Sequence, residues 1–304
     1  MKKLLTTPKV TLEQWRILLA VVEYGSFAAA ADRLLKSQST VSYAMARLQE
    51  QLGVAVFEQQ GRKAVLTEAG ELVARRAQTL VSEAQSLEQA AIDLAAGWEP
   101  EIRIMVDVIV PQTLLINVLK QFAPESRHTR IELLEGSLSG TTDAIVHGHA
   151  DLALGGVLPT GYLSEPICQV QFVAVAAPDH PLAKLESPAR EGDLKLHRQF
   201  VVRDSGPRRR LDAGWLGAEQ RWTVSHFQQS VRLLVAGLGY AFIPHHVAQP
   251  YLDSGELVVV KVASGSTRDV PLRMVFADRE NAGPALQRFA EIVRDQGQTY
   301  RFSG

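Results

Sequence analysis

Apolar residues recur at three- and four-residue spacing through the first 52 positions, which predicts three short helices in succession. The first helix ends at Gly25, and Ser26 and Ser37 are suited to cap the second and third helices at their N-termini. The second helix is rich in alanine, which favours helix and lets neighbouring helices approach closely. The inward-facing positions are Leu12, Trp15, Leu18, Leu19, Val22, Phe27, Ala30, Ala31, Leu34, Val41, Ala44, Met45, Leu48 and Leu52.

The third predicted helix keeps a polar face on its outside. Short hydroxyl and amide side chains at a helix N-terminus can reach base edges and phosphates of DNA. The pattern is typical of a helix-turn-helix, but a small three-helix bundle without a nucleic-acid role shares the same periodicity, so both interpretations stay open at this point. The candidate DNA-binding residues are Ser37, Gln38, Ser39, Thr40, Ser42, Tyr43, Arg47 and, further along the chain, Arg62.

Two further observations favour DNA binding. Val54, Val56 and Val65 flank a turn at Gly61-Arg62-Lys63, which predicts a two-stranded wing beside the helices. Residues 1–66 carry nine basic and five acidic side chains, a net charge of +4, whereas the remaining 23 basic and 28 acidic side chains give −5. A basic end on an acidic body is typical of a DNA reader, and because +4 is modest, we expect two copies to act together.

A long helix is predicted from Thr67 to about residue 96, followed by a break at Gly97-Trp98-Glu99-Pro100. Its apolar stripe suits an antiparallel partner helix, although a helix packed only on its own domain is the alternative. The stripe consists of Leu72, Ala77, Leu80, Ala84, Leu87, Ala91 and Leu94.

Beyond Pro100 the pattern alternates between strands and helices. We expect strands at 102–108, 130–134, 151–154, 171–177, 199–202, 240–243 and 272–276, and helices at 111–123, 139–148, 226–237 and 283–295. Such alternation predicts parallel sheets covered by helices on both faces, here in two lobes.

A ligand site is expected where these strands end. Open α/β sheets bind ligands at the carboxyl ends of their strands, where helix N-termini offer free N–H groups. The mixture of side chains there suits a small molecule with an apolar or aromatic body and an anionic or carbonyl end. The candidate ligand-binding residues are Val108, Ser137, Leu138, Arg203, Ser225 and Phe227.

Several classes of protein and site are disfavoured. The sequence has neither an apolar run long enough to cross a membrane nor an apolar signal core after Met1, so we expect a cytoplasmic protein with no membrane partner. The single cysteine, Cys168, excludes an intramolecular disulfide. His147 with His149, and His245 with His246, lack a third metal ligand in sequence, and no nucleophile–base pair suggests catalysis. We therefore expect no metal site, no cofactor and no enzyme activity.

The N-terminal motifs resemble those of LysR-type transcriptional regulators. The matching residues are Gly25-Ser26-Phe27, Ala30-Ala31, Leu34, Ser37-Gln38, Val41-Ser42, Leu48, Leu52-Gly53, Phe57, Arg62 and Leu66-Thr67-x-Ala69-Gly70. By position, Gln38, Ser39, Ser42 and Tyr43 match the family's major-groove contacts, and Arg62 matches a wing arginine that enters the minor groove. Gln59 departs from the arginine usual in the family's wing, which removes a cation near phosphate.

The resemblance implies a domain organisation and a set of partners. Residues 1–66 would form an all-α winged helix-turn-helix, 67–97 a linker and dimerisation helix, and 98–304 an α/β effector domain resembling periplasmic binding proteins. Lobe I would span about 100–169 and 275–304, and lobe II about 170–274. The implied partners are double-stranded DNA, a small-molecule effector and further copies of the chain in a dimer or tetramer, with RNA polymerase as a candidate. A solute-binding protein without a DNA role is the main alternative, and an α/β enzyme is another.

Overall fold

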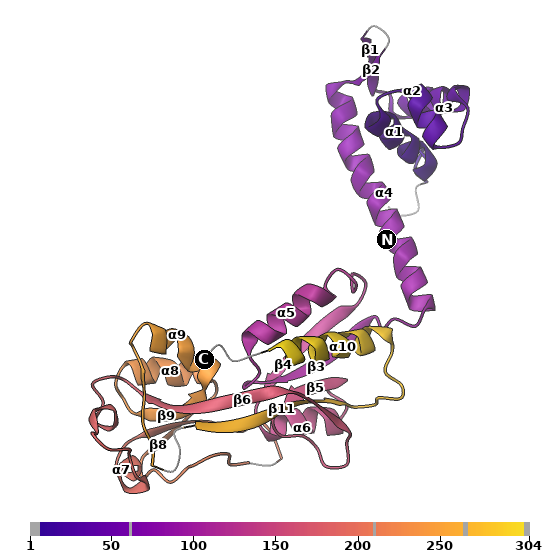
Figure 1. The fold of residues 1–304 in the computed structure, drawn as a ribbon. Helices are drawn as coiled ribbons and strands as arrows, with labels where there is room; N and C mark the ends of the chain where they lie inside the picture. The colour runs from indigo at the N-terminus through magenta and orange to yellow at the C-terminus, as the bar shows by residue number, and fades with distance from the viewer. Residues whose placement is uncertain (1–6, 61–62, 209–210, 264–266, 301–304) are drawn as a thin grey trace. The chain divides into compact units, whose positions relative to one another are not determined.

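The computed structural model of the chain describes residues 7–60, 63–208, 211–263 and 267–300. The chain divides into two compact units, which meet in sequence between Ala95 and Ala96 (Figure 1). Each unit has hydrophobic clusters of its own.

The N-terminal unit begins with three helices, as the periodicity predicts. They are α1 (Leu12–Tyr24), α2 (Phe27–Arg33) and α3 (Gln38–Leu52). Thr11 and Gln14 form a capping box on α1, and Ser26 caps α2 through a hydrogen bond from the N–H of Ala29. Gly25 ends α1 with a φ of 73°, a left-handed conformation that glycine adopts without strain.

The core of this unit lies among the three helices and includes the fully buried Leu18, Val41 and Leu48. The predicted inward face of α1 needs one correction, because Leu12 and Val22 are each 39% exposed. Ile17, Ala20 and Val21 are buried in their place, because the other two helices pack on a face of α1 rotated from the one that the leucine spacing suggests.

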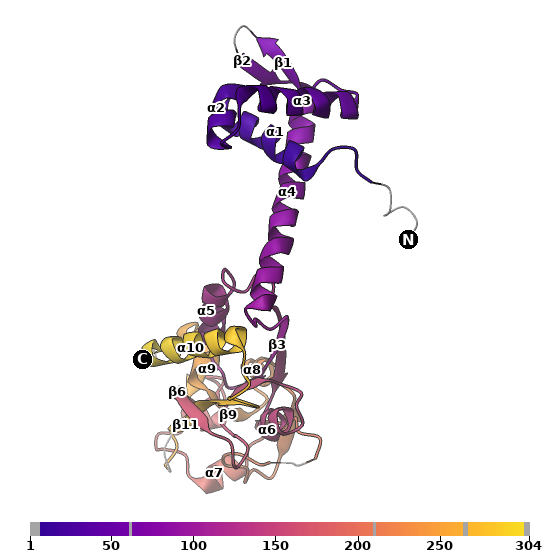
Figure 2. The same cartoon turned by 90° about the vertical axis from the view of Figure 1, so that its right-hand side faces the viewer.

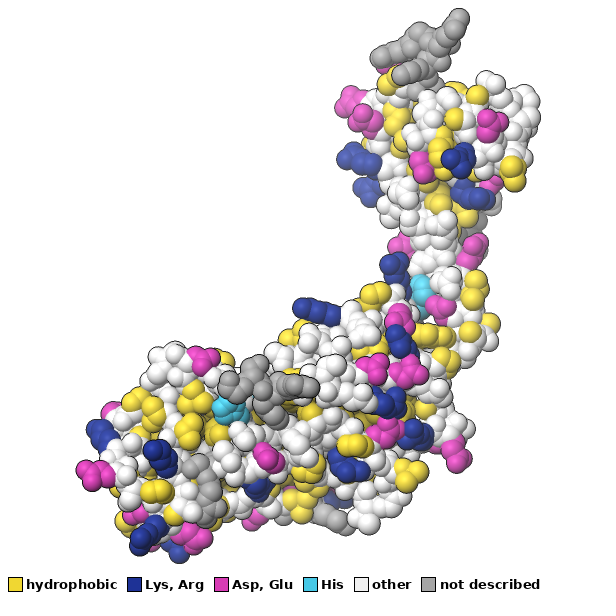
Figure 3. Space-filling model, viewed as in Figure 1, with side chains coloured by type: hydrophobic (Ala, Val, Ile, Leu, Met, Phe, Trp, Pro, Cys, Tyr) yellow, Lys and Arg dark blue, Asp and Glu magenta, His cyan; other side chains and the backbone are white. Residues whose placement is uncertain are grey.

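The predicted wing is formed by β1 (Phe57–Gln60) and β2 (Lys63–Leu66), which pair antiparallel from Phe57↔Leu66 to Gln60↔Lys63. Helix α4 (Glu68–Ala95) follows directly. It buries Ala74, Ala77 and Val81 towards its own unit, so Ala77 does not belong to the exposed stripe. Apolar side chains remain exposed on α4 (Figure 3), namely Leu72, Leu80, Leu87, Ile92 and Leu94.

The C-terminal unit is built on one mixed sheet of nine strands. Eight strands lie in the order β4-β3-β5-β11-β6-β9-β7-β8, and β10 pairs with β6 at the side of this path. The strands are β3 (Glu101–Asp107), β4 (Arg130–Gly136), β5 (Leu152–Gly155), β6 (Ser164–Ala176), β7 (Gln199–Val202), β8 (Arg221–Val224), β9 (Tyr240–Pro244), β10 (Val258–Val259) and β11 (Thr267–Phe276).

Two long strands, β6 and β11, run antiparallel through the middle of the sheet and connect its lobes. Val170 pairs with Val270 midway, β11 continues beside β5 in lobe I, and β6 continues beside β9 in lobe II. The expectation of parallel sheets is therefore correct for β3 with β4 and for β7 with β8, and wrong for the centre. The centre is antiparallel because the chain crosses from lobe I to lobe II as the extended strand β6 and returns in the opposite direction as β11.

Helices cover both faces of each lobe (Figures 1 and 2). In lobe I, α5 and α10 pack on one face, with the rings of Phe122 and Phe289 5.4 Å apart, and α6 packs on the other. In lobe II, α8 and α9 cover one face and α7 the other. These helices are α5 (Gln112–Phe122), α6 (Ser139–Val146), α7 (Glu191–Lys195), α8 (Phe227–Val235), α9 (His245–Asp253) and α10 (Pro284–Thr299), with a short 3-10 helix, η2 (Pro181–Lys184).

Candidate functional site

The N-terminus of α3 carries linked hydroxyl groups. The Ser37 hydroxyl accepts a hydrogen bond from the N–H of Thr40 at 3.1 Å and caps the helix. It also lies 2.8 Å from the hydroxyl of Ser39 and 2.7 Å from that of Thr40. Ser37 therefore has a structural role in starting the helix, in addition to any contact that it makes with a ligand.

The predicted DNA-binding residues of α3 all lie on the surface of the N-terminal unit. Ser37, Gln38, Ser39, Thr40, Ser42, Tyr43 and Arg47 are exposed. Tyr43 is 73% exposed, and no hydrogen bond to another described residue engages Gln38, Ser42 or Tyr43. The helix thus presents unengaged amide, hydroxyl and phenol groups, the kinds of group that read base edges and phosphates.

The remaining part of this surface is only partly described. Arg47 lies on the next turns of α3 and forms an exposed ion pair with Glu50 at 2.5 Å, which raises the pKa of Arg47. Arg62 and the side chain of Gln59 lie outside the described residues, although the backbone of Gln59 pairs with Ala64 in the wing.

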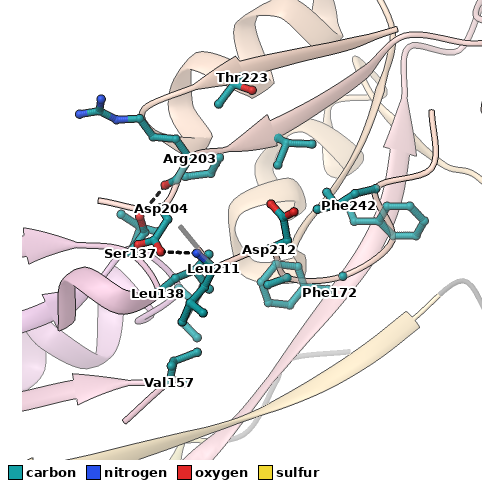
Figure 4. Close-up of a pocket in the computed structure, with 18 of the residues that line it drawn as sticks. Ser137, Leu138, Val157, Phe172, Arg203, Asp204, Leu211, Asp212, Thr223 and Phe242 are labelled. Atoms are coloured by element: carbon teal, nitrogen blue, oxygen red, sulfur yellow. Dashed lines mark hydrogen bonds between the residues drawn. The ribbon is translucent and has the colours of Figure 1, made fainter. Parts of the chain in front are cut away.

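A cavity of about 1250 Å³ lies in the C-terminal unit (Figure 4). Five of the six predicted ligand-binding residues line this cavity, namely Val108, Ser137, Leu138, Arg203 and Phe227. The carboxyl ends of β3 and β4 in lobe I and of β7 and β8 in lobe II bring these residues together. Ser225 does not line this cavity, because it faces a neighbouring cavity of about 550 Å³ that also includes Glu135 and His226.

The lobes are joined at the edge of the larger cavity by hydrogen bonds between residues 137–139 and 203–205. The Ser137 hydroxyl donates to the carbonyl of Arg203 at 2.6 Å, and the Ser137 N–H donates to the Ser205 hydroxyl at 2.8 Å. The Ser139 hydroxyl donates to Asp204 Oδ2 at 2.6 Å. We call this set of bonds the interlobe latch.

Asp204 changes the expected use of the α6 N-terminus. Its Oδ1 accepts the N–H of Ser139 at 3.0 Å, and its Oδ2 accepts the N–H of Leu211 at 2.7 Å (Figure 4). Although burial opposes the charge, these hydrogen bonds and those from Gly206 and the Ser139 hydroxyl lower the pKa of Asp204. The expectation of free N–H groups at this helix start was wrong, because an acidic side chain from the other lobe occupies them.

A second acidic residue, Asp107, contacts the backbone of the latch segment at Leu138. Asp107 ends β3, is 3% exposed and accepts hydrogen bonds from the N–H groups of Ile109 and Leu138 and from the Thr141 hydroxyl. Burial raises the pKa of Asp107 to about 6 despite these donors. The bond to Leu138 supports an unusual backbone, since Leu138 has a φ of 50° and a ψ of −114°.

The cavity contains charged and aromatic residues that the sequence reasoning missed. Asp107 is the last residue of β3, and Asp204 follows the predicted site residue Arg203 after β7, so a rule that includes all polar residues at strand ends would have found them. Phe172 lies in the middle of β6 and Arg268 near the start of β11, with the guanidinium 5.6 Å from the ring centre. No local signal marks these two, because only the pairing of β6 with β11 brings them to the cavity.

The histidine pairs considered in the sequence have other surroundings. His147 contacts the carbonyl of Asp143 and the guanidinium of Arg208, and its ring lies 6.1 Å from that of His149. Desolvation lowers the pKa of His246 to about 4, with a contribution from the neighbouring His245. In the part of the chain that the structure describes, no group of three or more His, Cys, Asp or Glu side chains is placed to hold a metal ion.

No helix within the described ranges combines the length and the apolar character needed to cross a membrane.

Family models match both units. The model described as a bacterial regulatory helix-turn-helix protein of the lysR family matches residues 12–71, and the model described as a LysR substrate binding domain matches residues 95–298. The chain is 33% identical over 261 residues to the HTH-type transcriptional regulator YeeY of Escherichia coli strain K12, with 84% of each chain covered. It is 31% identical over 266 residues to YhaJ, a probable HTH-type transcriptional regulator of the same strain, with 86% and 89% covered.

Solved structures share the fold. Full-length LysG from Corynebacterium glutamicum superposes with a TM-score of 0.52 at 20% identity and covers 95% of this chain and 98% of its own. LysG with bound effector Arg gives a TM-score of 0.51 at 20% identity, with 94% and 98% covered.

Proposed function

The chain belongs to the LysR family of DNA-binding transcriptional regulators with an effector-binding domain, and from this premise we propose which of its residues contact DNA and effector. The DNA contacts are the exposed residues of α3, with Gln38, Ser39, Ser42 and Tyr43 in the major groove and Arg47 near phosphate, and Arg62 in the minor groove. The observation that carries this assignment is the row of exposed polar side chains on α3, among which Gln38, Ser42 and Tyr43 form no hydrogen bond with another described residue.

A matched pair of arginine variants tests the DNA surface. Arg47 and Arg16 form equivalent exposed ion pairs with glutamates three residues away, Glu50 and Glu13. We expect Arg47→Ala to weaken binding of the full chain to DNA selected from a random pool by about tenfold and to reduce its salt dependence. Arg16→Ala removes a similar ion pair and should leave the affinity within about twofold. Equal losses for both variants in a fluorescence anisotropy titration would contradict the assignment.

The effector site that we propose is the cavity of about 1250 Å³ between the ends of β3, β4 and β7. Its aromatic walls and arginine side chains suit a small molecule with an apolar or aromatic body and an anionic or carbonyl end. Because residues of both lobes line the cavity, a ligand there can shift the population of lobe arrangements and thereby alter DNA binding.

Thermal melting of the full chain with aromatic acids and purine-pathway compounds tests this site. A ligand at 100 times its Kd should stabilise the folded chain by about 2.7 kcal/mol, which is readily seen as a higher Tm. Arg203→Ala should reduce the shift for an anionic compound, whereas Arg127→Ala, at an exposed position outside the cavity, should preserve it. Flat curves for every compound would count against the proposed site.

We also infer the finer organisation of the regulator. Residues 1–66 form the DNA-binding domain, 67–97 the dimerisation helix and 98–304 the effector domain with the lobe boundaries given above. The chain acts in the cytoplasm as a homodimer or dimer of dimers, and RNA polymerase is its further partner when it activates transcription. The exposed leucines of α4 support the dimer.

A further inference from the structure

One buried side chain in the cavity has an unused hydrogen-bond acceptor. Gln199 begins β7, is 2% exposed and donates from Nε2 to the carbonyl of Trp215 at 2.7 Å. That bond determines the orientation of the amide, because a carbonyl oxygen accepts only from the NH₂ end. The Gln199 Oε1 atom receives no hydrogen bond from any residue in the described ranges, although such buried acceptors are normally satisfied.

Gln199 is one of the residues that line the cavity, and it lies at the position beyond which β7 and β9 separate. Strand β7 pairs with β9 at a single position, Gln199↔Tyr240, whereas β9 pairs with β6 along its whole length. The segment that contains Trp215 covers this face of lobe II, and Gln199, Trp215 and Phe242 all line the cavity. Gln199 begins β7, whereas the latch residues 203–205 follow the end of this strand. We call the part of the cavity around Gln199, Trp215 and Phe242 its inner end.

The inner end is aromatic. The Trp215 and Tyr240 rings have centres 6.4 Å apart, and the Tyr240 and Phe242 rings 6.3 Å apart. Trp215 and Phe242 are half-buried and turn part of their surface to the cavity, so they offer apolar faces to a flat molecule. The cavity is also larger than the roughly 300–1000 Å³ of ordinary ligand pockets, which leaves room for a ligand that occupies both ends.

We propose, on the basis of the effector site assigned above, that the effector is a planar heteroaromatic carboxylate that donates a ring N–H to Gln199 Oε1. Its ring lies against Trp215 and Phe242, and its carboxylate points to the lobe boundary, where Arg203 and Arg268 supply positive charge. An acceptor that is already desolvated in the empty protein favours a ligand that satisfies it over an analogue that cannot. Gln199 is then a specificity-determining residue for the N–H group.

Matched ligand pairs test this proposal on the full chain. The probes are indole-3-carboxylate and benzimidazole-2-carboxylate, each compared with its N1-methyl counterpart, which keeps the ring and charge but has no donor at N1. Binding is measured by calorimetry. We expect the wild type to prefer the N–H member of a pair by at least about tenfold. Gln199→Met should reduce this preference to about twofold or less, and Gln220→Met, at an exposed position outside the cavity, should retain it.

The ratio of the two affinities within a pair distinguishes a loss of N–H recognition from a general loss of structure. A general loss of structure in Gln199→Met weakens both members alike. In Gln199→Glu, burial favours the protonated acid, which donates from its hydroxyl to the Trp215 carbonyl and keeps an acceptor at the other oxygen, so this variant should retain the preference. If Gln199→Met does not fold, the wild-type ratio and Gln199→Glu decide. Equal affinities within each pair would overturn the inference, as expected if a water molecule satisfies Gln199. Failure of every pair to bind at millimolar concentration would overturn it as well.

The results that would reject the proposed effector site differ from those that would reject the role of Gln199. If some other compound binds and Arg203→Ala weakens it while Gln199→Met does not, the effector site stands and only the role of Gln199 is rejected. If no compound of any class raises the Tm of the full chain, both proposals fail.

Discussion

At the scale of single residues, two aspartates show how the environment shifts the pKa of the same group in opposite directions. Asp204 is held as an anion by four hydrogen bonds and lies at the N-terminus of α6. Asp107 accepts three hydrogen bonds but is almost completely buried, and burial raises its pKa to about 6. Since Asp107 holds the N–H of Leu138 at the start of α6, its protonation affects the backbone that carries the latch.

The Asp107 pKa predicts a pH-dependent stability. Between an unfolded-state pKa near 4 and the folded value of about 6, the folded chain binds more protons than the unfolded chain. The stability that neutral Asp107 contributes is therefore complete below about pH 4 and is lost as the pH rises through 6. Asp107→Asn cannot ionise, so we expect its Tm relative to the wild type to increase by about 3 °C between pH 5 and 7.5.

The control for this pH dependence is Asp253→Asn on the exposed side of α9. Its Tm difference from the wild type should stay constant over the same interval. Tm is measured by differential scanning calorimetry. If the Tm of Asp107→Asn changed with pH as much as that of the wild type, Asp107 would not titrate in this range.

At the scale of elements, hydrogen bonds attach the start of α4 to the segment between α3 and β1. The N–H of Thr67 donates to the carbonyl of Val56 at 3.0 Å, and the Thr67 hydroxyl donates to the carbonyl of Ala55 at 2.7 Å. Gly70 follows in the first turn, and a β-carbon there would overlap the Val56 carbonyl oxygen. The match between Gly70 and the family motif thus has a steric reason, which is a close approach of helix and backbone.

This contact predicts an unusual response to a glycine-to-alanine substitution in a helix. Alanine is the better helix former, yet Gly70→Ala should lower the unfolding free energy of the N-terminal unit by about 1–3 kcal/mol because the helix must move away. Gly192→Ala in α7 is the matched control, since no atom lies within 4 Å of its added β-carbon. Thermal melting of both variants tests the prediction, and equal stability of the two would refute it.

At the scale of the whole molecule, the apolar surface of α4 indicates assembly. Leu72, Leu80, Leu87, Ile92 and Leu94 are 49–72% exposed, which is unfavourable for a helix that remains in water. A second copy of the chain with the same stripe can cover them by helix pairing. Pairing also places two DNA-binding units together, which compensates for the modest +4 charge of each N-terminal segment.

We therefore expect Leu87→Glu to weaken self-association by at least about tenfold, because it places a charge in an apolar contact. DNA affinity should fall with it at low protein concentration. Leu163→Glu, at a position 81% exposed in the C-terminal unit, is the control and should leave both properties unchanged. Sedimentation velocity measures the association, and an unchanged dimer in Leu87→Glu would exclude this face as the interface.

The sequence by itself determined the features that depend on local spacing. Three-residue and four-residue periodicity located α1, α2 and α3, cap residues located their ends, and the motif from Gly25 to Gly70 identified the family. Alternating strands and helices identified a two-lobed α/β domain, and strand ends located five of the residues around the cavity. These signals are read within a few turns of chain, so no tertiary information was needed.

Only the tertiary structure decided what long-range pairing controls. The antiparallel course of β6 and β11 brings Phe172 and Arg268 together from positions far apart in sequence. Likewise, Asp204 reaches α6 from the other lobe and takes the N–H group expected to be free. The segment around Trp215 bonds only the amide nitrogen of Gln199, which lines the cavity. The physical reason is the same in each case: the partner of a polar or aromatic group is chosen by how strands pair and lobes meet, which local periodicity does not encode.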